Sequence, residues 1–591
     1  MKMNTILEKF IDWRLKHISD QRFMLILSVI TGLAVGIAAV VIKNSVHFIK
    51  HLLTSDFAEQ YQNYLYFVYP TIGILGAVVF MRYILKQQVG HGIPSVLYAK
   101  SKTNGIIKPH NVYSSIITSA LTVGFGGSVG LEGPTVATGA AVGSNIGRVL
   151  RLNYKQITSL LGFACAGAMA AIFKAPIAAI VFALEVIMLD LTMSALVPLL
   201  TASVTAALTS YFVFGMEALY TFELKDKFLL SDVPWYILFG VVAGLVSVYF
   251  TEVYNFVGKI FDRFKSWYVR LIIGGVILGI LVFFFPSLYG EGYEALNACL
   301  TGDYSYLFDN SIFYPYRDSI TVTIILILAI VLLKVVGTSV TFGSGGIGGI
   351  FAPSLFMGAN IGLFFAKVVN VSQFGSISEN NFALVGMAGL IAGVIHAPLT
   401  AIFLIAEITG GHQLFMPLMI VATISYGTAK VFEKNSVYTI QLAKRGELMT
   451  HHKDKALLSL MKINTLIETN FATIHPNATL RDLVKVISGS SRNIFPVVDE
   501  KQKFHGIIVM DQVREIMFKP ELYDITFVRN LMFMPTNTVQ SDEPMEQVAH
   551  KFQHSGKYNL VVLEKDKYLG FVSRANVFSK YRELLKDFSE E

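Results

Sequence analysis

Cysteine and charge are both scarce in this chain of 591 residues. Cys165 and Cys299 are too few to form a disulfide framework, and Cys165 lies in an apolar run, as a small core residue does. Charged residues make up 15% of the sequence and hydrophobic residues 53%, which excludes a large soluble enzyme and indicates an integral membrane protein. Phe23 to Val41 and Leu271 to Gly290 are uncharged runs close to the length that crosses a bilayer.

The chain also lacks a concentrated basic patch. Its net charge of +7 comes from residues spread through short connections and the tail, so we expect no nucleic-acid partner. No cleavable signal pattern is present, because Met1 to Arg22 is charged and amphipathic, as expected of a surface helix. No nucleophile–base pair or metal-ligand cluster stands out, so we expect neither an enzyme nor a bound metal.

One acid stands in a long segment that has no other charge. Between Lys108 and Arg148 the only Asp, Glu, Lys or Arg is Glu132, inside the sequence GFGGSVGLEGP from Gly124 to Pro134. An acid at membrane depth costs several kcal/mol and marks a candidate functional site. The glycines permit close backbone approach and Pro134 suits a first helical turn, which together predict an anion site at a helix N-terminus. The alternative is a packing crossing with Glu132 in a salt bridge.

A second glycine-rich loop has no ionisable side chain near it. Val335 to Ala366 contains none, and its centre from Gly343 to Pro353 reads GSGGIGGIFAP, with a helix start expected at Ala352 and Pro353. A cation site would carry carboxylates or a dense ring of carbonyl oxygens, so this loop also favours an anion. The alternative is that the small residues mediate helix packing.

A repeated segment indicates that the chain has two related halves. Ala175 to Glu185 reads APIAAIVFALE and Ala397 to Glu407 reads APLTAIFLIAE, an offset of 397 − 175 = 222 residues with five of eleven positions identical. Each copy follows a glycine-rich loop, and interrupted helices of this kind build ion sites in transporters. Further apolar segments and one polar, exposed loop are expected at these positions: Tyr64 to Met81, Gly133 to Gly147, Ile157 to Phe173, Trp235 to Thr251, Phe415 to Val431, and the loop Glu291 to Arg317.

The tail has a different composition, with more charge and no long apolar run. Its residues 465–591 hold two similar units, each with a helix followed by two strands, which predicts a compact α/β module. The expected elements are, in the first unit, Asn477 to Ser488, Phe495 to Val498 and Gly506 to Val509, and in the second, Glu543 to Gln553, Asn559 to Leu563 and Gly570 to Ser573.

Four motifs in order resemble the CLC family of chloride channels and chloride/proton exchangers. They are GHGIP (Gly90 to Pro94), GLEGP (Gly130 to Pro134), GGIFAP (Gly348 to Pro353) and Tyr438, and the resemblance covers roughly residues 20–445. The tail resembles a CBS-domain pair. The resemblance implies an all-α polytopic membrane protein with inverted repeats and broken helices, plus an α/β CBS pair. The implied divisions are an N-terminal helix (1–22), a transport domain (23–445), a linker (446–464) and CBS domains (465–528 and 529–591).

The resemblance also implies a homodimer in the cell (inner) membrane, with both termini and the CBS pair cytoplasmic and one chloride pathway per subunit. Glu132 is similar to the family's gating glutamate, whose carboxylate competes with the anion. The implied anion ligands are His91, Gly130, Gly133, Ile350, Phe351 and the hydroxyl of Tyr438. His91 replaces the serine that is common there, and lone histidines often have a structural role instead. The alternative for Tyr438 is an interfacial anchor.

Two positions bear on mechanism and regulation. The proton-relaying glutamate of many exchangers falls at Val186, so the sequence favours a passive channel, with chloride/proton exchange as the alternative and a CBS-regulated cation transporter as a remote one. Glu185 and its repeat partner Glu407 are expected to act at helix ends. Ser573 and Asn576 approximate a site for the ribose of adenine nucleotide, the one cofactor considered, and Val509 and Asp511 do so less closely. The alternative for the CBS pair is a purely stabilising role.

Overall fold

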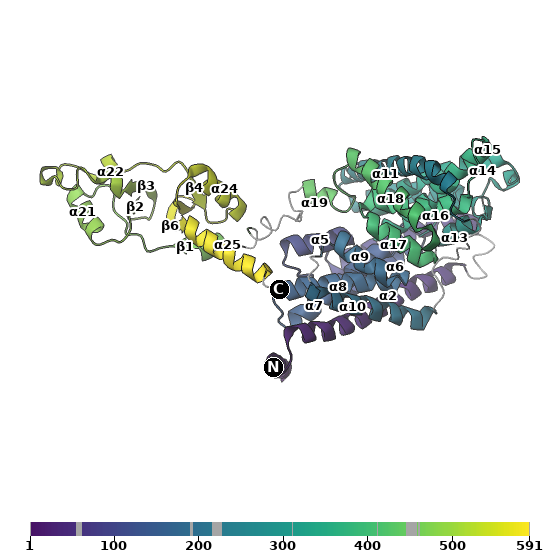
Figure 1. Cartoon of the computed structure of the whole chain (residues 1–591), viewed down its shortest axis with the longest axis horizontal. Coiled ribbons are helices and arrows are strands. Elements are labelled where there is room, and N and C mark those ends of the chain that lie inside the picture. Colours follow the sequence, from purple (N-terminus) through teal and green to yellow (C-terminus); the bar gives the residue numbers. More distant parts are fainter. Residues whose placement is uncertain are drawn as a thin grey trace. The chain divides into compact units, whose positions relative to one another are not determined.

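The computed structural model describes residues 2–54, 62–90, 92–189, 193–215, 227–309, 311–410, 412–444, 458 and 461–589 (Figure 1). The chain divides into two compact units, Met1–Leu448 and Met449–Glu591. The first is helical and the second mixes short strands with helices, so the predicted fold class is confirmed.

The first unit is a bundle of helices. Among the described residues, nine helices are long and apolar enough to cross a membrane. In chain order the helices are α1 (Lys2–His17), α2 (Asp20–Thr54), α4 (Gln62–Val79), α5 (Ile93–Lys102), α6 (Asn111–Gly124), α7 (Glu132–Val149), α8 (Tyr154–Phe173), α9 (Pro176–Glu185), α10 (Met193–Phe214), α11 (Val233–Asp262), α12 (Trp267–Phe284), α13 (Tyr293–Thr301), α14 (Ile320–Gly343), α15 (Phe351–Val371), α16 (Glu379–Ile395), α17 (Pro398–Thr409), α18 (Phe415–Phe432) and α19 (Ile440–Lys444).

The helices follow the predicted two-halves pattern. α8 and α9 are separated by Lys174 and Ala175, and α16 and α17 by His396 and Ala397, 222 residues later in the chain. Both Lys174 and His396 adopt left-handed backbone angles, with φ of 57° and 60°, before the helix-starting proline. In each half the helix after the glycine-rich loop packs on the next one, α7 on α8 and α15 on α16 (Figure 1).

Two sequence expectations were wrong in this unit. α12 ends at Phe284 rather than continuing to Gly290, because Pro286 cannot continue an α-helix. The segment from Glu291 to Arg317 is not simply an exposed loop, since it contains α13. That helix buries Leu296, Cys299 and Leu300 on one face, a helical spacing masked by the surrounding polar and aromatic residues.

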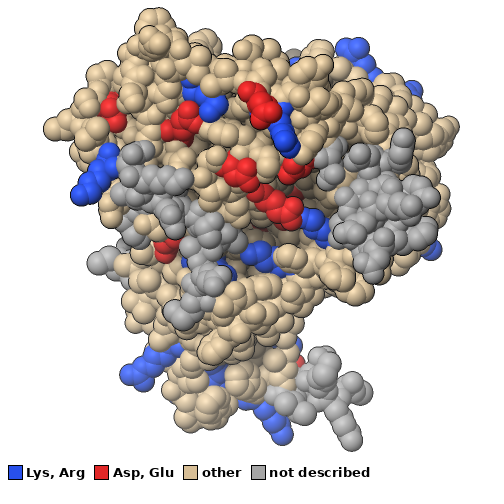
Figure 2. All heavy atoms as spheres, turned by 90° about the vertical axis from the view of Figure 1, so that its right-hand side faces the viewer, with Lys and Arg blue, Asp and Glu red and all other residues tan. Residues whose placement is uncertain are grey.

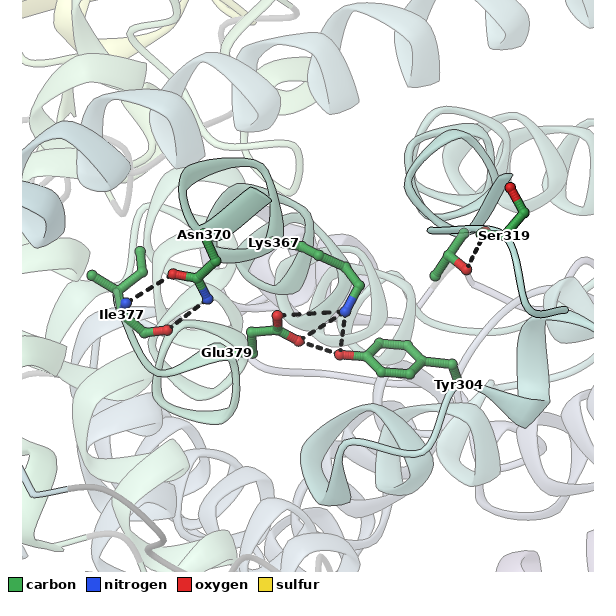
Figure 3. A network of polar contacts seen from close by, with 7 residues as sticks. Tyr304, Ser319, Lys367, Asn370, Ile377 and Glu379 are labelled. Carbon is green, nitrogen blue, oxygen red and sulfur yellow. Dashed lines mark hydrogen bonds and ion pairs between the residues drawn. The ribbon is translucent and has the colours of Figure 1, made fainter. Parts of the chain in front are cut away.

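A polar network holds the far end of α15 in place (Figure 3). The ammonium of Lys367 on α15 lies 3.1 Å from a carboxylate oxygen of Glu379 in the first turn of α16, and it donates to the hydroxyl of Tyr304 at 2.9 Å. Tyr304 in turn donates to Glu379. Asn370 and Ile377 add two hydrogen bonds of 2.9 Å across the α15–α16 turn. These contacts fix the C-terminal end of α15, the helix whose N-terminus follows the second glycine-rich loop.

The second unit contains two small sheets. The first pairs β2 (Ile494–Val498) with β3 (Phe504–Val509), next to α21 (Leu480–Ser488). The second sheet has the strand order β1–β6–β5–β4. The helices α24 (Met545–Ser555) and α25 (Arg574–Ser589) come from the same stretch of sequence as β4, β5 and β6. Its strands are β1 (Ile467–Glu468), β4 (Thr538–Gln540), β5 (Asn559–Glu564) and β6 (Lys567–Ser573). The six predicted elements of the tail are confirmed within a few residues.

Candidate anion site

Two glycine-rich loops from the two halves meet through their backbones. The amide of Gly130 donates to the carbonyl of Gly349 at 2.8 Å, and the amide of Gly349 donates to the carbonyl of Gly130 at 2.7 Å. Next to this bridge, a Cβ on Gly133 would lie 3.2 Å from the carbonyl oxygen of Gly348. The glycines therefore allow a backbone-to-backbone contact that larger residues would push apart. The two glycine-rich loops identified in the sequence therefore lie against each other.

Glu132 lies at this junction and is the first residue of α7. Its side chain is fully buried, with 0% of the residue exposed. Oε1 accepts a hydrogen bond from the hydroxyl of Tyr293, whereas Oε2 has no hydrogen-bond partner among the described residues. A Cβ on Gly130 would lie 2.1 Å from Oε2, so the carboxylate occupies the space that this glycine leaves open. No salt bridge to Glu132 is found in the described part of the chain, in contrast to the packing alternative.

The N-terminus of α15 approaches the same carboxylate. α15 begins at Phe351 with Ile350 as its N-cap, and the backbone amide of Ala352 lies near the Glu132 side chain, as does that of Glu132 itself. The first amides of a helix have no acceptor within the helix and carry a partial positive charge. Two helix N-termini, one from each half of the chain, thus converge on one buried carboxylate. This is the arrangement that favours a small anion.

A third predicted loop contacts the first. His91 itself lies outside the described residues. Its neighbour Gly92 has φ of +59°, and a Cβ on Gly92 would lie 3.0 Å from the Cα of Gly133. The GHGIP loop therefore packs against the GLEGP loop just before α5, which has Pro94 in its first turn.

Tyr438 is buried rather than anchored at a membrane surface. Only 5% of the residue is exposed, and its hydroxyl has no hydrogen-bond partner among the described residues. Glu132 is close enough to act on it electrostatically. Tyr438 also lines a cavity of about 150 Å³ together with Val186 and His396. A buried hydroxyl without a partner is a donor available to a ligand.

Sequence reasoning missed four polar side chains beside this site. Lys334 is the one charged residue of α14, and Lys43 on α2 directly follows the uncharged run that begins at Phe23, a signal that could have identified both. Glu291 and Tyr293 come from the segment expected to be a loop. Figure 2 shows acidic side chains gathered beside a hollow in which basic side chains lie.

The repeat glutamates have the helix-end role expected of them. The carboxylate of Glu185 accepts from the amides of Leu399 and Thr400 at 3.2 and 2.8 Å, at the start of α17. Glu407 on α17 accepts from the amides of Ile177 and Ala178 at 3.1 and 2.8 Å, at the start of α9. Each helix of this antiparallel pair is therefore capped by an acid of the other.

The candidate nucleotide residues of the tail already have partners within the protein. The hydroxyl of Ser573 accepts from the amide of Asn576 at 3.1 Å, which caps α25, and the side chain of Asn576 donates to Glu468 at 2.8 Å. Glu468 also accepts from Arg492 at 2.9 Å. In the first half of the tail, Asp511 pairs with Arg514 at 2.5 Å. The contacts of Glu468 tie β1 to both halves of the tail, through Arg492 and Asn576.

The comparisons with known proteins agree with this geometry. The family model for voltage gated chloride channels matches residues 72–430, and the CBS domain model matches residues 463–519 and 528–583. A putative chloride channel protein, ClcB-like, from Ralstonia nicotianae is 30% identical over 64% of this chain and 85% of its own length. The H(+)/Cl(-) exchange transporter ClcA from Vibrio campbellii is 27% identical over 70% of this chain and 88% of its own length.

Solved structures share the fold. The crystal structure of a slow cyanobacterial Cl-/H+ antiporter covers 71% of this chain and 97% of its own, with a TM-score of 0.60 and 21% identity. The crystal structure of a eukaryotic CLC transporter covers 94% of this chain, with a TM-score of 0.58 and 16% identity. The chain therefore belongs to the CLC family of voltage gated chloride channels, as a multi-pass membrane protein for anion transport that carries a pair of CBS domains.

Proposed function

We propose that this protein exchanges chloride for protons, and that Glu132 both closes the anion path and carries the proton. The observation that carries the proposal is the position of Glu132. It is a fully buried carboxylate at the point where two helix N-termini converge, and one of its oxygens has no hydrogen-bond partner among the described residues. An ionised carboxylate and a chloride ion compete for the same backbone amides. When Glu132 takes up a proton it loses its charge and the competition shifts toward chloride. Proton binding and chloride binding are then linked at one place.

The names of relatives support exchange over the passive channel that the sequence favoured. Several relatives from Vibrio species, 26–27% identical to this chain, are named H(+)/Cl(-) exchange transporters. They cover 70% of this chain. The remote alternative of a cation transporter is contradicted by family membership.

A passive chloride channel is the second candidate. Val186 stands where many exchangers have a proton-relaying glutamate, and its apolar side chain cannot carry a proton. It lines the same cavity as Tyr438. The Ralstonia relative is named a putative chloride channel protein. This candidate and exchange differ in one measurable quantity, which is the number of protons moved per chloride.

Several features go with either candidate. We propose a homodimer with one pathway per subunit, in the cell membrane, with both termini and the CBS pair on the cytoplasmic side. His91, Ile350, Phe351 and the hydroxyl of Tyr438 would supply donors to the anion. Adenine nucleotide at Ser573 and Asn576 would require Asn576 to release Glu468.

A flux assay with purified protein in liposomes tests the proposal. Paired chloride and pH electrodes should record proton uptake driven by a chloride gradient in the wild type. Glu132→Gln should still pass chloride, but with proton movement at background. Glu294→Gln is the matched control, because that side chain is 86% exposed and should leave both fluxes unchanged. Proton coupling that persists in Glu132→Gln would refute the role of this carboxylate.

A further inference from the structure

Glu291 brings a second carboxylate to the N-terminus of α7. Its Oε1 accepts from the backbone amide of Leu131 at 3.2 Å, one residue before Glu132. Two residues after Glu291, the hydroxyl of Tyr293 donates to Oε1 of Glu132. The turn from Glu291 to Tyr293 therefore contacts the site twice, once through an acid and once through the donor that holds the other acid.

Two buried lysines lie beside these carboxylates. The Nζ of Lys334 on α14 donates to the carbonyls of Gly290 and Leu288 at 3.0 and 3.3 Å, and its positive charge acts on Glu291. Lys43 on α2 donates to the carbonyl of Ile172 at 3.3 Å and has Glu291, Lys174 and Glu132 as electrostatic neighbours. In the described part of the chain both ammonium groups donate to neutral carbonyl oxygens, and the acids act on them through space.

We propose that Glu291 is a second proton-binding residue of the anion site, which takes up a proton when an anion binds next to it. The proposal rests on the proposed function, since it assumes that chloride occupies the site at Glu132.

Repulsion between like charges is the physical reason. An ionised Glu291 and a chloride ion at the start of α7 would place two negative charges close together in a buried, poorly hydrated region, which is costly even with Lys43 and Lys334 nearby. Protonation of Glu291 removes this repulsion, so proton binding and chloride binding are thermodynamically linked.

Glu291 is better placed than Glu132 to receive that proton from solution. Glu132 is fully buried, whereas Glu291 is half-buried in the connection between α12 and α13. Burial, followed by the nearby Glu132 carboxylate, raises the pKa of Glu291, while the positive charges of Lys43 and Lys50 oppose this. Lys50 is itself paired with the exposed Glu294. The carboxyl of Glu291 is thus held nearer to neutral pH than that of an exposed glutamate.

Chloride binding in the background of Glu132→Gln isolates the effect of Glu291. We would measure the chloride Kd of the purified full-length protein by isothermal titration calorimetry at mildly acidic and mildly alkaline pH. Two buffers of different ionisation enthalpy would report proton uptake directly. With Glu132 removed, chloride should still bind more tightly at acidic pH, by up to about tenfold per pH unit for one linked proton.

The double variant Glu132→Gln, Glu291→Gln should bind chloride with the same Kd at both pH values and take up no proton. Glu291→Asp in place of Glu291→Gln keeps a carboxylate and should retain the pH dependence, which separates this role from a loss of folding. The proposal is overturned by a pH-independent Kd in Glu132→Gln, or by a dependence that survives Glu291→Gln. Wild-type protein that moves chloride without protons would contradict the proposed exchange. The linkage between Glu291 protonation and chloride binding would still be tested, because it is measured from the pH dependence of the Kd.

Discussion

Glu185 and Glu407 each cap the helix that carries the other. Glu185 ends α9 and accepts from the first amides of α17, and Glu407 lies on α17 and accepts from the first amides of α9. The contact is reciprocal because the two segments are repeats that pack antiparallel. This reciprocal contact explains why both copies of the repeated segment end in a glutamate.

Removing either charge should destabilise this helix pair while transport continues. Glu185→Gln and Glu407→Gln keep an acceptor oxygen but lose the charge that faces a helix N-terminus, which should cost roughly 1 kcal/mol each. Thermal unfolding of the detergent-solubilised protein would show a lowered midpoint. A Glu185→Gln protein of normal stability that no longer moves protons would instead make Glu185 a proton relay.

The hydroxyl of Tyr293 should restrain Glu132 in the blocking position. Tyr293→Phe removes the donor to Oε1, so chloride should displace the carboxylate more readily, by roughly 1.5–3 kcal/mol for a hydrogen bond to a charged group. The measurement is the chloride concentration that gives half-maximal flux, which should fall by about tenfold or more. Tyr249→Phe is the control, since that hydroxyl donates to the carbonyl of Leu332. An equal shift in both variants would contradict a specific role for Tyr293.

Gly130 should tolerate no side chain. A Cβ there would lie 2.1 Å from Oε2 of Glu132 and 2.9 Å from the Cβ of Ala352, so Gly130→Ala must displace the carboxylate, the backbone bridge or both. We expect flux with a weaker pH dependence than the wild type if the loop survives, and a misfolded protein if it does not. Gly427→Ala is the comparison, because its Cβ would have no described atom within 4 Å, and it should be neutral or slightly stabilising. Normal, pH-dependent flux in Gly130→Ala would show that the site is more open than described.

Ser573 should matter for stability of the tail whether or not nucleotide binds there. Its hydroxyl caps α25, so Ser573→Ala should cost about 1 kcal/mol. Ser579→Ala, at an exposed position in the same helix, should have no such cost. Differential scanning calorimetry of the full chain with and without ATP would compare the two. A larger stabilisation by ATP in Ser573→Ala than in the wild type would exclude this hydroxyl as a ribose ligand.

Local signals in the sequence were sufficient for much of the structure. Glycine-rich turns followed by proline placed the starts of α7 and α15 correctly, because these residues fix backbone geometry within a few positions. The tail strands followed from short β-branched and aromatic runs. By contrast, Glu291 and Tyr293 reach the site from about 160 residues away, as their contacts to Leu131 and Glu132 show. No local pattern encodes such a contact, and it arises only when α13 packs against α15.

The bridge between Gly130 and Gly349 has a consequence for how such a protein can change. Its two hydrogen bonds use only main-chain atoms, so the contact between the halves requires glycine at these positions but no particular polar side chain around them. Side chains that face the anion can be substituted while the hydrogen bonds between Gly130 and Gly349 remain in place. Selectivity among anions can therefore change through side-chain substitutions, while the main-chain hydrogen bonds keep the two halves in the same arrangement.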